Sequence, residues 1–490
     1  MTARSPRPPI ARTLVSALAL LLSACGGGGG AGGQSGGQTG GGQVGGGTPL
    51  PPPVAANCSL SDRQAWARSV IDEWYLYPET VPGTLSPAGF TSVQAYIDAL
   101  TATARAQGRD RFFTFVTSIA EENAFFAQGT TAGFGIRLQS DPVARRVTII
   151  EAYEGAPALA AGLDRGDRIE AIGTGPTSLT PVEDLFARGG AAAITDALGP
   201  NTAGLARTLR VSGPTGTRTV SVTKASFDIP PVSSRYGVQI LSDGGRQVGY
   251  LNLRTFISSA DAPLRQAFAR FRAAGVTDLV IDLRYNGGGL LSIAELFGDL
   301  LGRNRFAADV FGQTVYRPEK AANNRTRRFQ TVAESVAPTR IAFITTGSSA
   351  SASEVVINAM IPYLGANMAL VGANSFGKPV GQIALDRAAC DDRLRVLAFS
   401  TRNAAGSDNY FSGLAGVVPN SCQAADDTAL PLGDRNEASL RAALDFIAGR
   451  PCTPIPTGQQ ARSLGTTRTA PEPLLPANPS AAQLELPGLF

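Results

Sequence analysis

The chain of 490 residues is 43% hydrophobic and 17% charged, which is typical of a soluble globular protein with two or three domains. Its formal net charge of +4 is spread along the sequence without a basic block, so no footprint for nucleic acid is indicated. The histidine count is zero, which excludes every Ser-His-Asp, Cys-His and His-ligated zinc mechanism.

Residues 1–25 resemble a bacterial lipoprotein signal peptide. An apolar run from Leu14 to Leu22 follows a basic start, and Leu22-Ser23-Ala24-Cys25 puts Cys25 where a lipidated residue would stand. The run is too short to span a bilayer, although an ordinary signal peptide or a single membrane anchor is the alternative. The pattern predicts a protein lipid-anchored through Cys25 in the bacterial cell envelope, facing the periplasm or the cell surface. The outer membrane is favoured because Gly26 is not acidic.

The segment 26–57 is predicted to be a flexible tether, because its Gly-rich and finally Pro-rich composition cannot bury a core. An N-terminal helical domain is predicted over 58–130. There, apolar residues recur at helical spacing around a break at 78–89 marked by Pro and Gly: Trp66, Val70, Trp74, Tyr96, Ile97 and Leu100.

A second unit is predicted over 131–228. Short alternating stretches such as Arg146–Ile150 and Leu209–Val211 predict strands, and Ala161-Gly162-Leu163-Asp164-Arg165-Gly166-Asp167-Arg168-Ile169 lies between them. This order of strands and this residue string resemble a PDZ domain of the bacterial protease-associated type. The resemblance implies that a peptide adds as a strand beside a carboxylate-binding loop, formed here by Gly133, Phe134, Gly135 and Ile136.

From Arg246 onward the pattern becomes an alternation of strands and helices, which predicts an α/β core over 229–452. Strands are expected at 248–253, 279–283 and 341–345, and helices at 263–274, 290–301 and after Ser351. The tail over 453–490, rich in Pro, Thr and Ala, is predicted to be loosely ordered.

Three strings in this core carry the candidate chemistry: Asp282-Leu283-Arg284-Tyr285-Asn286-Gly287-Gly288-Gly289, Gly347-Ser348-Ser349-Ala350-Ser351-Ala352-Ser353-Glu354 and Ser375-Phe376-Gly377-Lys378-Pro379-Val380-Gly381-Gln382. In this order they resemble the C-terminal processing (tail-specific) peptidases. The resemblance implies an α/β multidomain protein with a crotonase-like β-β-α core, and a serine endopeptidase whose nucleophile is Ser351, whose base is Lys378 and whose assisting residue is Gln382. Gly287 departs from the family pattern, in which proline is common at this position.

Elementary chemistry agrees with these roles. A serine hydroxyl needs a neighbouring base, and without histidine that base is a lysine held neutral by burial. The neutral amide of Gln382 can bind the amine without the negative charge that would raise its pKa. The N–H of Ala352 and a second donor from Gly288 would stabilise the oxyanion.

Apart from Cys25, the cysteines are Cys58, Cys390, Cys422 and Cys452, an even number that predicts two disulfides in an exported protein. Three pairings are possible, and Cys390 with Cys422 and Cys58 with Cys452 are the expected ones. No metal and no organic cofactor is implied. The expected partners are protein substrates bound through their C-termini, and whether an adaptor is needed is not indicated.

Two other functions fit parts of the sequence. A penicillin-binding or β-lactamase-like enzyme would explain Ser221-Val222-Thr223-Lys224 and Ser407-Asp408-Asn409, but the first string lies in a predicted strand and no Lys-Thr-Gly follows. A catalytically inert lipoprotein that binds peptides through the PDZ unit is the second alternative.

Overall fold

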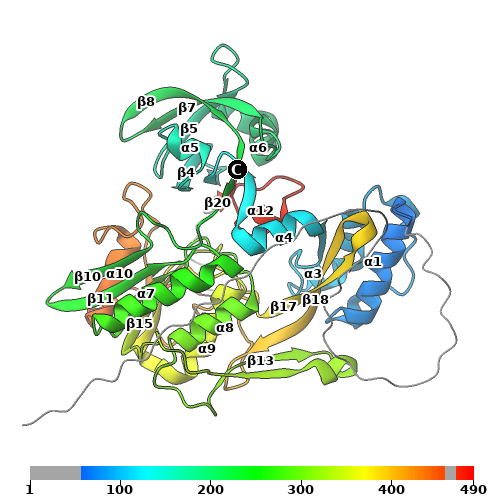
Figure 1. Cartoon of the computed structure of the whole chain (residues 1–490). Helices are drawn as coiled ribbons and strands as arrows, with labels where there is room; N and C mark the ends of the chain where they lie inside the picture. Colours follow the sequence, from blue (N-terminus) through cyan, green and yellow to red (C-terminus); the bar gives the residue numbers. More distant parts are fainter. Residues whose placement is uncertain (1–56, 458–470) are drawn as a thin grey trace, which may run out of the picture. The chain divides into compact units, whose positions relative to one another are not determined.

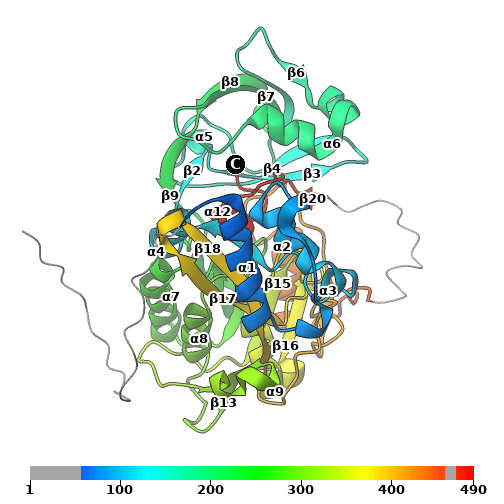
Figure 2. The same cartoon turned by 90° about the vertical axis from the view of Figure 1, so that its right-hand side faces the viewer.

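The computed structural model describes residues 57–457 and 471–490 (Figures 1 and 2). The predicted signal peptide, Cys25 and all but the end of the predicted tether lie outside these residues. Among the helices in the described ranges, none has the length and apolar character needed to cross a bilayer.

The first described segment is largely helical. Serines cap its helices: the side chains of Ser59, Ser92 and Ser118 each accept a hydrogen bond from a first-turn N–H. Its elements are α1 (Leu60–Trp74), α2 (Val93–Leu100), α3 (Ala102–Ala106), β1 (Phe115–Ser118) and α4 (Ile119–Gln128). The apolar faces of α1 and α2 pack on residues of later strands such as Leu394 and Val396. The segment therefore shares its core with the rest of the chain.

Residues 130–228 supply six strands of a seven-stranded sheet and both strands of a separate two-stranded sheet, β2 with β9, and they surround a hydrophobic core that also includes Leu474 and Phe490. The strands are β2 (Thr130–Gly133), β3 (Ile136–Asp141), β4 (Arg146–Ala152), β5 (Arg168–Gly173), β6 (Thr180–Pro181), β7 (Ala206–Gly213), β8 (Gly216–Thr223) and β9 (Ala225–Asp228). Helices α5 (Pro157–Ala160) and α6 (Val182–Leu198) accompany them. The seven-stranded sheet has the order β20-β3-β4-β5-β7-β8, with β6 on β5 and with β20 (Glu472–Pro473) contributed by the end of the sequence.

A six-stranded sheet forms the centre of the remaining chain, in the order β10-β11-β12-β15-β16-β19. The strands are β10 (Val238–Asp243), β11 (Arg246–Asn252), β12 (Asp278–Asp282), β15 (Arg340–Thr345), β16 (Met368–Gly372) and β19 (Ser421–Gln423), parallel from β11 onward. One face packs against α7 (Asp261–Ala273), α8 (Leu291–Leu300) and α9 (Ala352–Leu364), and the other against α10 (Ala438–Ile447). The predicted strand–helix alternation is thus present.

An antiparallel sheet lies beside this centre. It has the order β1-β18-β13-β14, and β17 also pairs with β18. The strands not yet given are β13 (Val310–Tyr316), β14 (Arg325–Arg328), β17 (Val380–Arg387) and β18 (Asp392–Arg402). β17 begins two residues after Lys378, so this sheet positions the predicted base.

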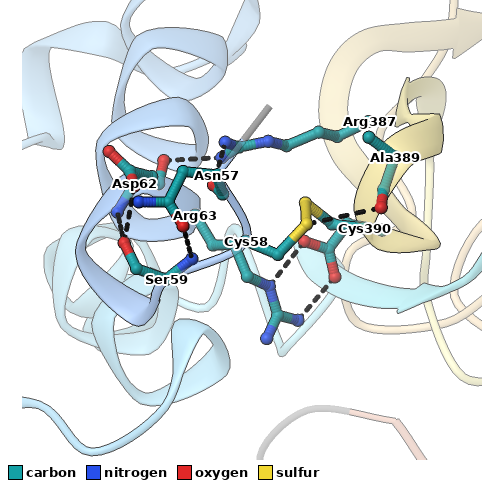
Figure 3. The surroundings of a disulfide bond; sticks show 9 residues. Asn57, Cys58, Ser59, Asp62, Arg63, Arg387, Ala389 and Cys390 are labelled. Atoms are coloured by element: carbon teal, nitrogen blue, oxygen red, sulfur yellow. Dashed lines mark hydrogen bonds and ion pairs between the residues drawn. A yellow bond between two sulfur atoms is a disulfide. The ribbon is translucent and has the colours of Figure 1, made fainter. Parts of the chain in front are cut away.

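The expected disulfide pairing is wrong. Cys58 bonds to Cys390 and Cys422 bonds to Cys452. Figure 3 shows the first bond joining the start of α1 to the turn between β17 and β18, where Arg63 also pairs with Asp392. The pairing follows the packing of α1 against β18, which brings Cys58 to this turn.

The expectation of a loosely ordered end is also wrong, for the part of it that is described. Residues 471–490 form β20 and α12 (Ala481–Glu485), and Leu474, Leu486 and Phe490 are at most 1% exposed. Apolar side chains scattered among prolines are buried here against another part of the chain, a tertiary effect that composition does not predict.

Candidate active site

Ser351 lies at a sharp turn between β15 and α9, as the N-cap of that helix. Its φ of +53° is a conformation that costs a residue with a side chain free energy, and such strain often occurs at functional sites. The hydroxyls of Ser349 and Ser353 are buried and donate to the carbonyls of Leu283 and Asn286, at 2.7 and 3.0 Å. Ser351 is thus the partly exposed serine of the three.

Glu354 joins the Ser351 turn to the Lys378 loop. One carboxylate oxygen, Oε2, accepts from the backbone N–H of both Ser351 (3.1 Å) and Lys378 (2.7 Å). The other, Oε1, accepts from the hydroxyl of Ser375 and the N–H of Gly377, each at 2.6 Å. Burial raises the pKa of Glu354 to about 6, although these hydrogen bonds act in the opposite direction. Two segments 27 positions apart in sequence are therefore held on a single buried carboxyl group.

The amine of Lys378 is buried between a neutral amide and an aromatic ring. Its Nζ donates to Oε1 of Gln382 at 2.8 Å and lies 4.8 Å from the centre of the Phe113 ring. Burial lowers the pKa of Lys378, while the carboxylates of Glu485 and Asp110 oppose part of that shift. A lysine with a lowered pKa is neutral at a lower pH than usual, which is the form that can accept a proton.

The first helical segment completes this site, which the sequence did not predict. The side-chain amide of Gln382 donates to the carbonyl of Phe113, so its oxygen is turned toward Lys378. Arg111 stacks on the Phe376 ring at 4.1 Å and donates to the carbonyls of Phe376 and Gly377. No sequence motif marks Arg111 or Phe113, because they act through backbone and ring contacts with a loop about 265 residues later in the chain.

The two predicted oxyanion donors differ in availability. Ala352 is the first residue of α9, so its N–H has no acceptor within the helix. Gly288 lies against this turn, since a Cβ built on it would be 2.7 Å from the Cβ of Ser351 and 3.0 Å from the N of Ala352. The N–H of Gly288, however, donates to Oδ1 of Asn286 at 3.0 Å. In this conformation Ala352 offers the available donor of the pair.

The predicted peptide-binding loop is at the start of β3. Gly133 ends β2, Phe134 is fully buried, and the N–H groups of Gly135 and Ile136 both donate to the carbonyl oxygen of Phe490, at 2.8 and 3.1 Å. The loop therefore binds an extended segment through its backbone.

The region 247–419 matches the model of peptidase family S41. The carboxyl-terminal-processing protease of Picosynechococcus sp. is 26% identical over 254 residues, which are 51% of this chain and 55% of that protein. The chloroplastic C-terminal processing peptidase of Tetradesmus obliquus is 33% identical over 173 residues, which are 33% of this chain and 35% of that protein. The chain thus matches about half the length of the first of these relatives and less of the second.

A crystal structure of an S41 protease from Bacteroides fragilis superposes with a TM-score of 0.62 at 24% identity, covering 78% of this chain and 97% of that one. At this identity the likeness shows a shared fold. The match to the family model adds a likeness in sequence, because the matched residues 247–419 include all three strings around Asn286, Ser351 and Lys378. Through residues 247–419 the chain is similar to peptidase family S41, and the relatives that it matches are C-terminal processing peptidases, which are serine peptidases.

Proposed function

We propose that this chain is a serine endopeptidase in which Ser351 is the nucleophile and Lys378 the general base. The observation that carries the proposal is the sharing of one Glu354 oxygen by the N–H groups of Ser351 and Lys378. This arrangement holds a partly exposed serine and a lysine with a lowered pKa on the same support. Nucleophilic catalysis requires such a pair.

The reaction follows from these positions. Neutral Lys378 accepts the proton of the Ser351 hydroxyl while Oγ attacks the peptide carbonyl, and the N–H of Ala352 stabilises the oxyanion. The ammonium of Lys378 then returns that proton to the leaving amine, which gives an acyl-enzyme. A water molecule, deprotonated by the same amine, releases the new carboxyl end and restores the serine. Gln382 orients the amine without adding charge.

The substrates in this proposal are proteins engaged through their C-terminal tails by the 131–228 unit, acting as a PDZ domain. Support comes from the hydrogen bonds that Gly135 and Ile136 already make to an extended segment beside β3. The central parallel sheet with helices on both faces supports a crotonase-like core over 229–452. The sequence around Cys25 supports lipid anchoring in the cell envelope, and Cys25→Ser should release the protein from the membrane fraction.

The assignment is tested with a fluorophosphonate probe and with β-casein as an unfolded substrate. Wild-type protein should label at Ser351 and cleave casein, whereas Ser351→Ala and Lys378→Ala should lose both activities while remaining folded. Lys320→Ala, which removes a lysine paired with the exposed Glu73, is the matched control and should keep both. Absence of labelling in wild-type protein that still binds peptides would instead favour the inert peptide-binding lipoprotein.

A further inference from the structure

The 471–490 segment lies along the edge of β3, which the proposed function assigns to substrates. Its first part forms β20, which pairs with β3 at Ser140 and Gln139. Its last part returns to the same strand, where the N–H of Leu138 donates to the carbonyl of Gly488 at 2.7 Å. The N–H of Phe490 donates to the carbonyl of Ile136 at 2.8 Å. Backbone pairing of this kind is how a peptide adds to a sheet.

The side chains at the end of this segment are enclosed. Leu489 and Phe490 are 0% and 1% exposed, and Phe490 belongs to the hydrophobic core of the 130–228 unit. A Cβ on Gly133 would be 2.7 Å from the carbonyl carbon of Phe490, so only glycine permits this approach. Gly488 has a φ of +91°, and a Cβ there would meet the Leu138 carbonyl at 2.5 Å. The fit thus requires glycine on both sides of the contact.

Between these two anchors the segment crosses to the candidate active site. Figure 1 shows α12 between the sheet that carries β4 and helix α4, and Figure 2 shows the same order from the side. The carbonyl of Glu485, the last residue of α12, would lie 2.4 Å from a Cβ on Gly287. Gly287 precedes Gly288, which faces Ser351. A substrate strand entering past this loop would meet the backbone of Glu485 and the ring of Pro487.

The charge of Glu485 acts on the base as well. Burial lowers the pKa of Lys378, but the Glu485 carboxylate raises it. With the segment in place, the amine is therefore held nearer to its protonated form, in which it cannot accept the Ser351 proton. Residues 481–485 form a helical turn and so do not present the extended backbone that peptide-bond hydrolysis needs.

We propose that the 471–490 segment is an intramolecular ligand that fills the peptide edge of β3 and covers the loop beside Ser351, so that substrates must displace it. The inference rests on the proposed function. It also names the class of peptide that competes: an extended segment with an aromatic residue in the position of Phe490 and glycine in the position of Gly488. The segment acts as an inhibitor that remains attached to the enzyme.

The first test loosens the segment within the full chain. Gly488→Val should release it, because the side chain is strained at this φ and collides with Leu138. Casein cleavage should rise about tenfold or more as the closed population falls. Amide hydrogen exchange at Gly135, Ile136 and Leu138 should become faster. Gly275→Val is the matched control, since that residue has a φ of +66° with nothing within 4 Å, and it should change neither measurement.

The second test restores inhibition with a synthetic peptide of residues 481–490. Added to the Gly488→Val protein, the peptide should raise KM without lowering kcat and should slow exchange at the same β3 amides. The same peptide carrying valine in place of Gly488 is the control and should do neither.

The outcomes separate this inference from the proposed function. If no form of the protein labels at Ser351 or cleaves casein, the proposed function is wrong, and the exchange at β3 still reports on the segment. If wild-type and Gly488→Val proteins cleave casein equally fast while β3 exchange accelerates, the segment does not block access to Ser351. A mass loss from the end of wild-type protein that Ser351→Ala abolishes would make the segment a substrate and overturn its role as inhibitor.

Discussion

In the proposed mechanism Lys378 must lose its proton before it can activate Ser351, so its surroundings should determine the pH range of activity. Burial lowers the pKa of its amine, and Gln382 contributes a neutral oxygen at 2.8 Å. Because the neutral amine is the active form, activity should rise with pH through the folded pKa of Lys378, which lies below that of an exposed lysine.

The substitution Gln382→Glu tests this dependence. A carboxylate next to the amine favours the ammonium and should raise the pKa of Lys378 by roughly 1–3 units. The rising limb of kcat/KM against pH should move to higher pH by that amount, so that activity at neutral pH falls at least about tenfold. Gln423→Glu adds the same charge at the exposed last residue of β19 and should leave the profile in place. An unshifted profile in the Gln382→Glu protein would contradict a neutral-lysine mechanism.

Glu354 is a positioning residue in this account, because it contacts Ser351 and Lys378 through their backbones. In Glu354→Gln one carboxylate oxygen is replaced by an NH₂ group. An NH₂ group is a donor, so it cannot accept the hydrogen bonds that this oxygen accepts in the wild-type protein. A displacement of about 1 Å in the reacting groups costs about 100-fold in rate, so kcat and the rate of fluorophosphonate labelling should fall by that order. KM should change little.

The control for this variant is Glu295→Gln, which alters another buried carboxyl group that pairs with Arg325 and Arg327 away from the site. It should lower stability without lowering kcat. Equal kcat values for the two variants, both folded, would show that Glu354 has no specific role in positioning.

At the scale of elements, the strands and helices of the core were predictable because their apolar patterns are strong. The expected strands at 248–253 and 279–283 correspond to β11 (Arg246–Asn252) and β12 (Asp278–Asp282), and the expected helices at 263–274 and 290–301 to α7 (Asp261–Ala273) and α8 (Leu291–Leu300). The antiparallel sheet that supports Lys378 was not predictable, because β1 and β18 pair across more than 270 residues. The same reason explains the missed contacts of Arg111 and Phe113, and the missed pairing of Cys58 with Cys390 across 332 residues.

The two disulfides should differ in their effect on stability. The Cys58–Cys390 bond closes a separation of 332 residues and the Cys422–Cys452 bond one of 30. The loop-entropy relation gives about 6 and about 4 kcal/mol as upper values for the two contributions. Replacing both cysteines of a pair by alanine should therefore lower the free energy of unfolding more for Cys58 and Cys390. Urea unfolding without reductant measures this, and the reverse order would refute the entropic account.

At the scale of the whole molecule, a polar network joins the 130–228 unit to the core that carries the candidate site. Arg165 pairs with Asp426 at 2.9 Å and donates to the hydroxyl of Tyr285 at the same distance. Arg137, on β3, donates to the carbonyl of Tyr285 at 3.0 Å. Tyr285 begins the glycine-rich loop that faces Ser351, so the peptide edge and the candidate site share these contacts.

Replacing Asp426 should weaken the attachment of the 130–228 unit to the core. Burial raises its pKa, but Arg165 and Arg284 outweigh burial and bring it below the ordinary value. Its contribution to stability is thus present above about pH 4 and is lost as the pH falls through the lower folded pKa. Asp426→Asn leaves two buried guanidinium groups without this partner and should cost roughly 3–5 kcal/mol at pH 7.

Urea unfolding followed by the fluorescence of Trp66 and Trp74 measures this loss, and limited proteolysis between β9 and β10 reports whether the 130–228 unit loosens. Asp445→Asn is the control, because Asp445 pairs with Arg441 and Arg450 at the surface, where such pairs contribute at most about 1 kcal/mol. Because the network reaches the loop beside Ser351, casein cleavage should fall in Asp426→Asn but not in Asp445→Asn. Equal losses of stability in the two variants would mean that the buried network does not hold the peptide unit to the core.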